Sequence, residues 1–293
     1  MTTLHAGIDE AGYGPLLGPL AIVLVAAEVA DGVDPAGAFA AAGTLVGDSK
    51  AIHTSGDLRA IEQVALAGLA WLTGSAPATA AACFTLLGED ESLRDDPWLH
   101  GAAELGLPIA APTSATWTRA GVTPRSVAGA LVHPAALNQA ARAGTNRATL
   151  ELERIGVLLR GLAPHPRRSV ICDRLGGRRY YRDALLAVWP TAMVLIDDEA
   201  VVCSAYRVAH AASETQMSFR VSGEQASPFV ALASCIAKYA RELHMLLLNR
   251  WWTAQVPGLR ATAGYGSDAH RWLSDVGDHR LAMVRQRLVR GVA

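Results

Sequence analysis

Two adjacent carboxylates, Asp9 and Glu10, stand near the N-terminus at the end of an apolar segment. Neighbouring carboxylates repel each other, which raises the pKa of one of them unless a cation compensates. Mg²⁺ is a natural compensator, because it binds carboxylate oxygens together with waters and substrate phosphate. The glycine turn GYGP at 12–15 follows directly. The pair therefore indicates a divalent-metal site, and two acidic residues in a solvated turn are the alternative.

Three further carboxylates lie at the ends of two short apolar runs that are typical of strands. Asp173 ends the run RRSVICD at 167–173, and Asp197 and Asp198 follow the run that begins at Thr191.

The elements that must position these carboxylates alternate between strand and helix patterns. Strands are predicted at 4–9, 19–29, 79–87, 167–173 and 191–197, with a glycine-turn hairpin joining the first two and an irregular hairpin at 201–223. Helices are predicted at 55–73, 134–142, 146–162, 179–187, 226–252 and 267–290. This order predicts an α/β protein with a mixed sheet and helices packed on it.

The length of 293 residues allows one large domain with insertions or two modest ones. We expect a single domain over 1–293, with a loop-rich insertion at 88–130 and a helical C-terminal part at 226–293. Hydrophobic residues make up 51% of the chain and the net charge is −1, so binding of nucleic acid would need a local basic patch. The four cysteines form no CxxC pair, and the N-terminus lacks the pattern of a signal peptide. We expect a cytoplasmic protein that does not enter a membrane.

The opening motif DEAGYGPLLGPL at 9–20 resembles that of the type 2 ribonucleases H, which has the form DE-(A/V)-G-x-G-P-x-x-G-P. Further resemblances follow in the family's order. They are GDSK at 47–50, SVICD at 169–173, SGEQASPFVALASCIAKYARE at 222–242 and AGYGSDAH at 263–270. The chain is thus similar to a divergent member of the ribonuclease HII and HIII group.

The resemblance implies a ribonuclease H-like fold in which four carboxylates gather around metal. Carried over by position, these catalytic and metal-binding residues are Asp9, Glu10, Asp173 and Glu224. The type 3 members also have Glu at the fourth position. The family has Asp-Gly where this chain has Asp173-Arg174, so Asp197 or Asp198 is the rival third carboxylate.

The implied chemistry is hydrolysis of a phosphodiester bond. Two divalent ions about 4 Å apart can activate a water and stabilise the leaving oxygen. Mg²⁺ or Mn²⁺ is the expected cofactor, with Asp9 and Asp173 as bridging ligands and Glu10 and Glu224 each serving one ion or its waters.

Substrate recognition must sense a 2′-hydroxyl, the group that separates RNA from DNA. The resemblance assigns this to Gly12, Tyr13, Gly14 and Tyr265, although the type 2 enzymes have Arg where this chain has Tyr13. Lys50 and Lys238 are candidate phosphate contacts, with an exposed lysine and a structural ion pair as the respective alternatives. Ser234 lies in an apolar helix, where it either contacts the site or bonds back to its own helix.

We therefore expect a metal-dependent endoribonuclease that cleaves RNA in RNA/DNA hybrids or at ribonucleotides within duplex DNA. No obligate protein partner is evident from the sequence. A nuclease of the same fold with another nucleic-acid substrate is one alternative. A non-catalytic relative that binds nucleic acid is the other.

Overall fold

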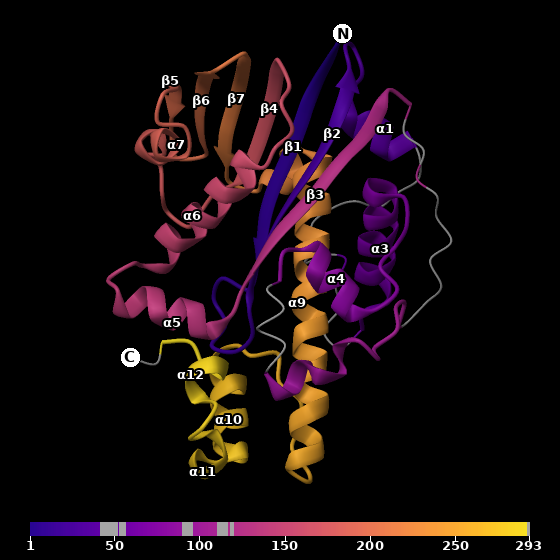
Figure 1. Ribbon diagram of the computed structural model, residues 1–293, viewed down its shortest axis with the longest axis vertical. Helices are drawn as coiled ribbons and strands as arrows, with labels where there is room; N and C mark the ends of the chain where they lie inside the picture. The colour runs from indigo at the N-terminus through magenta and orange to yellow at the C-terminus, as the bar shows by residue number, and fades with distance from the viewer. Residues whose placement is uncertain (42–51, 53–56, 90–95, 110–116, 118–119, 292–293) are drawn as a thin grey trace.

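A seven-stranded mixed sheet organises the molecule, in the order β3-β2-β1-β4-β7-β6-β5 (Figure 1). The computed structural model describes residues 1–41, 52, 57–89, 96–109, 117 and 120–291. The strands are β1 (Thr2–Ala11), β2 (Leu20–Ala30), β3 (Val122–Val132), β4 (Arg167–Asp173), β5 (Met193–Glu199), β6 (Cys203–His210) and β7 (Ser213–Arg220). β1, β4 and β7 run parallel to one another, and every other neighbouring pair is antiparallel.

Both faces of the sheet are covered by helices, and β2 shows this most directly. Its residues alternate between two hydrophobic cores: Val23 and Val25 belong to one, and Ile22 and Leu24 to the other. Successive side chains of a strand point to opposite faces, so a strand buried on both faces reads as one continuous apolar run. This is the physical reason for the run LAIVLVAA in the sequence.

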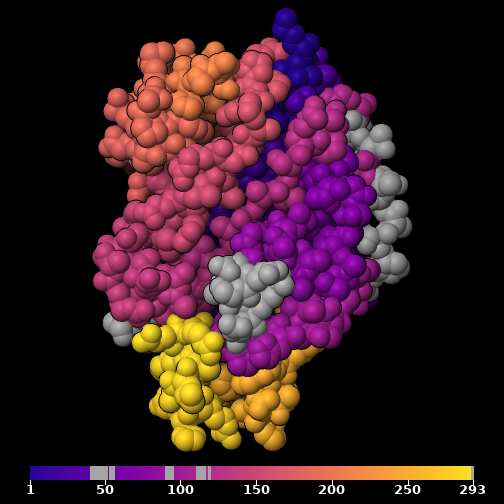
Figure 2. Space-filling view, in the orientation of Figure 1, coloured from indigo at the N-terminus to yellow at the C-terminus, as the bar shows by residue number. Residues whose placement is uncertain are grey.

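Each core has its own set of helices. The first core contains residues of α3 (Arg59–Thr73), α4 (Ala80–Leu86) and the long α9 (Pro228–Gln255), and the second contains residues of α5 (Pro134–Arg142), α6 (Arg147–Arg160) and α7 (Arg182–Val188). The remaining helices are α1 (Pro35–Ala41), η2 (Pro97–Ala102), α8 (Gly223–Ala226), α10 (Gly266–Val276), α11 (Asp278–Leu281) and α12 (Arg285–Leu288). Figure 2 shows the C-terminal segment, in yellow, beside the orange end of α9 at one pole of the molecule.

The approach of α9 to β1 depends on Gly7. A Cβ atom at this position would lie 2.1 Å from the backbone nitrogen of Val230, in the first turn of α9. Only glycine allows the helix backbone to come this close to the centre of the strand.

Most expected elements are confirmed, including the β1–β2 hairpin with Thr2 opposite Ala30, the strand at 167–173 and the helix at 134–142. The strand expected at 79–87 is wrong, because Ala80–Leu86 is helix α4. Thr79 caps this helix by accepting a hydrogen bond from the Ala82 N–H at 3.2 Å. Periodicity cannot separate a short buried strand from a short buried helix, and three consecutive alanines favour the helix.

Two other expectations need correction. The single helix expected at 267–290 is divided into α10, α11 and α12, and Gly277, with φ of 83°, ends the first of them. The proposed insertion at 88–130 stays a prediction as a domain boundary, but its last part, from Val122, forms the edge strand β3. Among the described residues, no helix combines the length and apolarity needed to cross a membrane.

Candidate functional site

The carboxyl ends of the three parallel strands meet at one edge of the sheet. Asp9 and Glu10 lie near the end of β1, Asp173 is the last residue of β4, and Glu224 follows β7 after a short turn. Parallel strands deliver the residues at their carboxyl ends to a common edge. One carboxylate oxygen from each of Asp9, Glu10 and Asp173 lies within 4.8 Å of the others.

Asp9 and Glu10 point to opposite faces of β1 and still reach one site. Pairing of β1 with β4 stops at Ile8 opposite Cys172, whereas pairing with β2 continues to Ala11. The strand was expected to end at Asp9, and this is wrong: the strand continues, and only its ladder with β4 ends. Beyond that point β4 adds only its last residue, Asp173, so the side chains of Asp9 and Glu10 can approach each other around the end of β4.

Burial and mutual repulsion hold protons on these carboxyls. Burial, followed by repulsion from Glu10 and Asp173, raises the pKa of Asp9 well above its ordinary value. A hydrogen bond from the Ser234 hydroxyl opposes this rise in the pKa of Asp9, and so does the Glu10 N–H, which donates to Asp9 Oδ1 at 2.7 Å. Ser234 therefore contacts the cluster from α9, and its part in substrate binding stays a prediction.

A fourth acidic side chain, Glu151, reaches the cluster from α6, and sequence reasoning missed it. Glu151 is fully buried, and neither of its carboxylate oxygens has a hydrogen-bond partner among the described residues. Burial, with repulsion from Asp9 and Asp173, raises the pKa of Glu151 to about 8. The available signal was its position on the apolar face of the helix, four residues before Ile155.

Glu10 shows the same electrostatic strain. Burial raises the pKa of Glu10 to about 8, helped by repulsion from Glu151 and Asp173. Orphaned, buried carboxylate oxygens crowded together are costly unless a cation binds them. An all-oxygen donor set of this kind fits Mg²⁺ or Mn²⁺.

Asp173 is held in place by the turn after β7. The Gly223 N–H donates to Asp173 Oδ1 at 2.8 Å, which ties the end of β4 to the start of α8. Glu224, the next residue, is partly buried and lies outside the group of three clustered carboxylates. Its role as a fourth ligand stays a prediction.

The rival carboxylates lie elsewhere. Asp197 is exposed on the edge strand β5, where it pairs with Arg207 at 3.0 Å, and Asp198 is exposed beside it. Three strands, β4, β7 and β6, lie between β1 and β5 in the sheet. Asp173 is therefore the third carboxylate that the fold brings to Asp9 and Glu10.

The glycine turn after β1 is braced by arginines from distant parts of the chain. Gly12 has φ of 86°, and a Cβ atom there would lie 2.5 Å from Cδ of the fully buried Arg241. Arg290, near the C-terminus, donates to Gly12 O at 2.5 Å and to Gly18 O at 2.6 Å. The turn thus has a fixed backbone, with several of its carbonyl groups held by guanidinium groups.

Tyr13 and Tyr265 each lie against an arginine. Arg147 of α6 donates to Tyr13 O, and its guanidinium carbon lies 5.3 Å from the centre of the Tyr13 ring. Arg241 lies 5.0 Å from the centre of the Tyr265 ring, and Tyr265 is 43% exposed. Sequence reasoning gave Arg147 no role, because the helix spacing alone does not show that it reaches the turn.

The remaining predicted substrate residues have mixed outcomes. Lys238 forms an ion pair with Glu242 at 2.8 Å, one turn along α9, which matches the structural alternative. Gly14 has open space around its α-carbon. Lys50 and its GDSK segment lie outside the described residues.

No family model and no curated protein sequence matches this chain. Its structure is similar to Bst-RNase HIII in complex with Mn²⁺, with a TM-score of 0.51 and 16% identity over 99% of this chain and 66% of that one. A mutant of Bst-RNase HIII gives a TM-score of 0.51 and 15% identity, over 98% of this chain and 66% of that one. RNase HII from Archaeoglobus fulgidus, solved with PCNA, gives 0.47 and 17%, over 98% and 94%.

The likeness shows the fold. The α/β, ribonuclease H-like architecture expected from the sequence is confirmed, with a mixed sheet, flanking helices and a helical C-terminal part. The chain spans about two thirds, 66%, of the length of Bst-RNase HIII.

Proposed function

We propose that this chain is a metal-dependent endonuclease of the ribonuclease H type. Its substrate is RNA in RNA/DNA hybrids, or ribonucleotides within duplex DNA. The observation that carries the proposal is the gathering of Asp9, Glu10 and Asp173 at the carboxyl ends of parallel strands, with the orphaned Glu151 against them. The shared fold with Bst-RNase HIII supports the reaction class.

The metal is Mg²⁺ or Mn²⁺, held by Asp9, Glu10 and Asp173, with Glu224 completing the set from α8. Bst-RNase HIII has been crystallised with Mn²⁺, which supports a divalent ion at the equivalent edge here. When bound, a pair of such ions activates the attacking water and stabilises the leaving oxygen of the phosphodiester. Binding requires that the carboxyls release the protons that burial otherwise keeps on them.

Residues that contact the clustered carboxylates prepare this site. Ser234 orients Asp9 by its hydrogen bond, and the Gly223 N–H orients Asp173. Glu151 closes the α6 side of the cluster, where its carboxylate would accept a hydrogen bond from a water of the loaded site or take up a proton. These contacts hold the carboxylates in place before substrate arrives, which is how outer contacts support metal sites.

The glycine turn supplies the substrate-binding donors. Arg290 and Arg147 hold the carbonyl groups of Gly12 and Tyr13. Because C=O and N–H of a trans peptide point in opposite directions, the next N–H groups, of Tyr13 and Gly14, are turned away from these arginines. We assign these N–H groups and the exposed Tyr265 to the phosphate and 2′-hydroxyl of a ribonucleotide.

The experiment is cleavage of three labelled duplexes with Mg²⁺ or Mn²⁺: an RNA/DNA hybrid, DNA with one ribonucleotide, and plain DNA. We expect cleavage of at least one ribonucleotide-containing duplex, and its loss in Asp9→Asn and with excess chelator. Cleavage of plain DNA would favour a nuclease of the same fold with another nucleic-acid substrate. Tyr13, which stands where the type 2 enzymes have arginine, would then not select for the 2′-hydroxyl. Binding of duplex without cleavage by folded protein would contradict the proposal and favour a non-catalytic role.

A further inference from the structure

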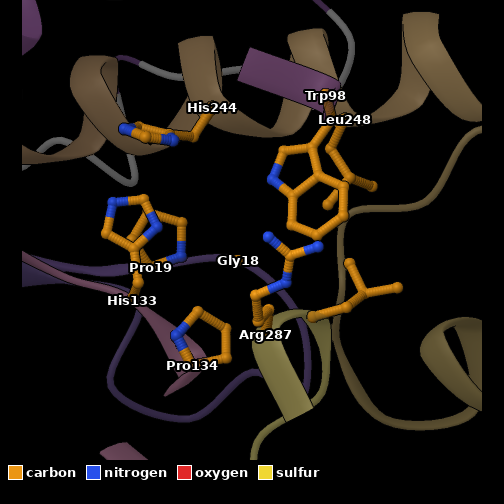
Figure 3. Close-up of a pocket in the computed structure, with 9 residues that line it drawn as sticks. Gly18, Pro19, Trp98, His133, Pro134, His244, Leu248 and Arg287 are labelled. Atoms are coloured by element: carbon orange, nitrogen blue, oxygen red, sulfur yellow. The ribbon is translucent and has the colours of Figure 1, made fainter. Parts of the chain in front are cut away.

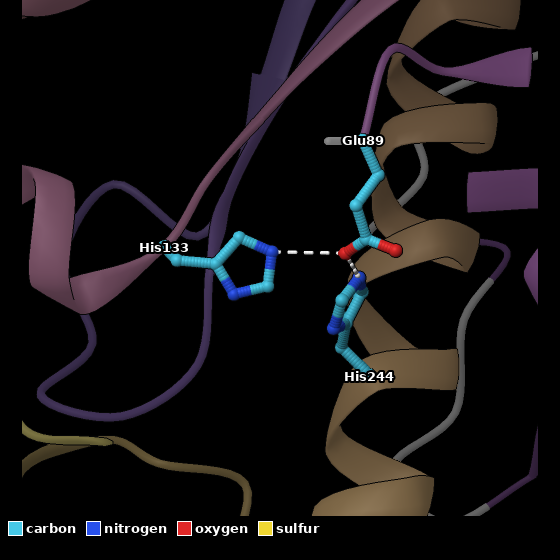
Figure 4. A group of neighbouring side chains, drawn as sticks. All are labelled: Glu89, His133 and His244. Carbon is cyan, nitrogen blue, oxygen red and sulfur yellow. Dashed lines mark hydrogen bonds and ion pairs between the residues drawn. The ribbon is translucent and has the colours of Figure 1, made fainter. Parts of the chain in front are cut away.

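A second cluster of metal-binding side chains lies inside the molecule, on different elements from the carboxylates. Glu89 follows α4, His133 lies between the end of β3 and the start of α5, and His244 lies in the middle of α9 (Figure 4). Glu89 Oε1 is 2.9 Å from His133 Nε2 and 3.0 Å from His244 Nε2. All three residues are buried, with exposures between 3% and 6%.

The donors of this cluster are incompletely used by the protein. His133 Nε2 has hydrogen-bond geometry towards Glu89 Oε1. His244 Nε2 contacts the same oxygen without hydrogen-bond geometry, and Glu89 Oε2 has no hydrogen-bond partner among the described residues. Unpaired polar atoms in the interior are rare and call for a ligand, an ion or a water. Figure 4 shows the rings of His133 and His244 both facing the Glu89 carboxylate.

We propose that Glu89, His133 and His244 bind a divalent transition-metal ion of the zinc class. Two imidazoles and one carboxylate suit Zn²⁺, whereas Mg²⁺ and Mn²⁺ favour sites made only of oxygen. With metal–ligand bonds of about 2.1 Å, tetrahedral ligands lie roughly 3.4 Å apart, so the donors need to separate by only a few tenths of an ångström.

The fourth position has a place for a water. A cavity of about 10 Å³ borders both histidines and is also lined by Gly18, Trp98 and Arg287 (Figure 3). This volume is about that of one water-sized probe. Three protein ligands with one water form a complete tetrahedral set.

The orientation of His244 is fixed by packing. The Phe84 ring stacks on its imidazole with 4.0 Å between centroids, and the His133 ring meets it edge-on at 5.1 Å. Phe84 therefore acts as a positioning residue for this ligand.

The zinc-class site is separate from the carboxylate site. His244 is ten residues after Ser234 on the same straight helix, which places the two sites about 15 Å apart along its axis. Its function would be to join α4, β3 and α9. Because Gly18 lines the adjoining cavity, the metal would also fix the far end of the glycine turn.

The test loads the purified full-length chain with Zn²⁺ alone and measures retained metal by mass spectrometry after dialysis against metal-free buffer. We expect about one tightly held equivalent, lost in Glu89→Gln and in His244→Asn. The exposed His270→Gln is the matched control and should keep its equivalent. Asp9→Asn should also keep it, which separates this site from the carboxylate site.

A second measurement needs no variant, since buried histidine substitutions can prevent folding. Co²⁺ bound at this site in the wild-type protein should show the visible absorption of tetrahedral coordination, and Zn²⁺ should displace it. The proposal is overturned if the wild-type chain retains no Zn²⁺ and shows no such Co²⁺ spectrum. It is also overturned if retained Zn²⁺ is lost in Asp9→Asn but kept in folded Glu89→Gln.

Discussion

At the scale of single residues, the acidic cluster holds carboxyl groups that repel one another when they are charged. Glu151 has an exposed neighbour of the same type, Glu153, on the same helix, yet only Glu151 faces Asp9 and Asp173. A helix spacing of two residues turns a side chain by more than half a turn, which explains the difference. The consequences of this placement are measurable in the metal-free protein.

The first consequence is a pH dependence of stability. The pKa values of Glu10 and Glu151 are raised to about 8 in the folded chain, from ordinary values of 4.5. Between these values the folded state binds more protons than the unfolded state, so the free energy of unfolding falls as pH rises. We expect the Tm in chelator to fall from pH 5 to pH 8, and added Mn²⁺ to oppose the fall. A Tm that rises over this range would contradict the assignment.

The second consequence concerns Glu151→Gln. Removing this buried charge should raise the Tm of the metal-free protein at pH 8 and flatten its pH dependence. The same change should lower metal-dependent cleavage by about 10–100-fold, as losses next to metal ligands do. Differential scanning fluorimetry and cleavage assays measure both effects, with Glu153→Gln as the control. If both variants behave alike, Glu151 has no part in the site.

At the scale of elements, the sequence predicts those helices and strands whose pattern lies within a short run of neighbouring residues. The β1–β2 hairpin follows from the glycine turn between two apolar runs, and Asp173 was predicted at a strand end from the run RRSVICD. The α4 helix was mistaken for a strand, because a seven-residue apolar run carries no clear period. The role of Glu151 depends on α6 packing over β1, which no local pattern reveals.

The contact between β1 and α9 gives a stability prediction at this scale. Gly7→Ala forces a Cβ atom onto the backbone of Val230, 2.1 Å away, and backbone cannot move aside as a flexible side chain can. We expect a loss of at least about 2 kcal/mol in the free energy of unfolding.

Urea denaturation of Gly7→Ala measures this loss. Gly177→Ala is the matched control, because nothing lies within 4 Å of a Cβ atom there, and it should change the free energy by less than about 0.5 kcal/mol. Equal stability of the two variants would refute the close approach of α9 to β1.

At the scale of the whole molecule, the C-terminal segment reaches back to the glycine turn that follows β1. Arg290 is almost completely buried and bonds to Gly12 and Gly18, 278 and 272 residues away. Burial, with repulsion from Arg241 and Arg147, lowers the pKa of Arg290 to about 9. The segment that follows α12 thus fixes the backbone that follows Asp9 and Glu10.

Arg290→Met tests this connection. Loss of the guanidinium group leaves the buried carbonyl groups of Gly12 and Gly18 without this donor. We therefore expect a decrease of about 2–4 kcal/mol in the free energy of unfolding, and slower cleavage. Arg285→Met is the control, because the side chain of Arg285 forms an exposed ion pair with Asp278, and this pair should contribute at most about 1 kcal/mol. Chemical denaturation of both variants gives the comparison, and an unchanged Arg290→Met would contradict the bracing of the turn.

The most direct measurement of the central claim compares cleavage of an RNA/DNA hybrid by the wild-type chain, Asp173→Asn and Asp197→Asn under the same Mn²⁺ concentration. The account predicts a loss of at least about 100-fold in Asp173→Asn, because it removes a ligand of the clustered carboxylate site. Asp197→Asn, whose carboxylate pairs with Arg207 on the edge strand, should cleave within about twofold of wild type. A folded Asp173→Asn that retains full activity, or a loss confined to Asp197→Asn, would contradict the site.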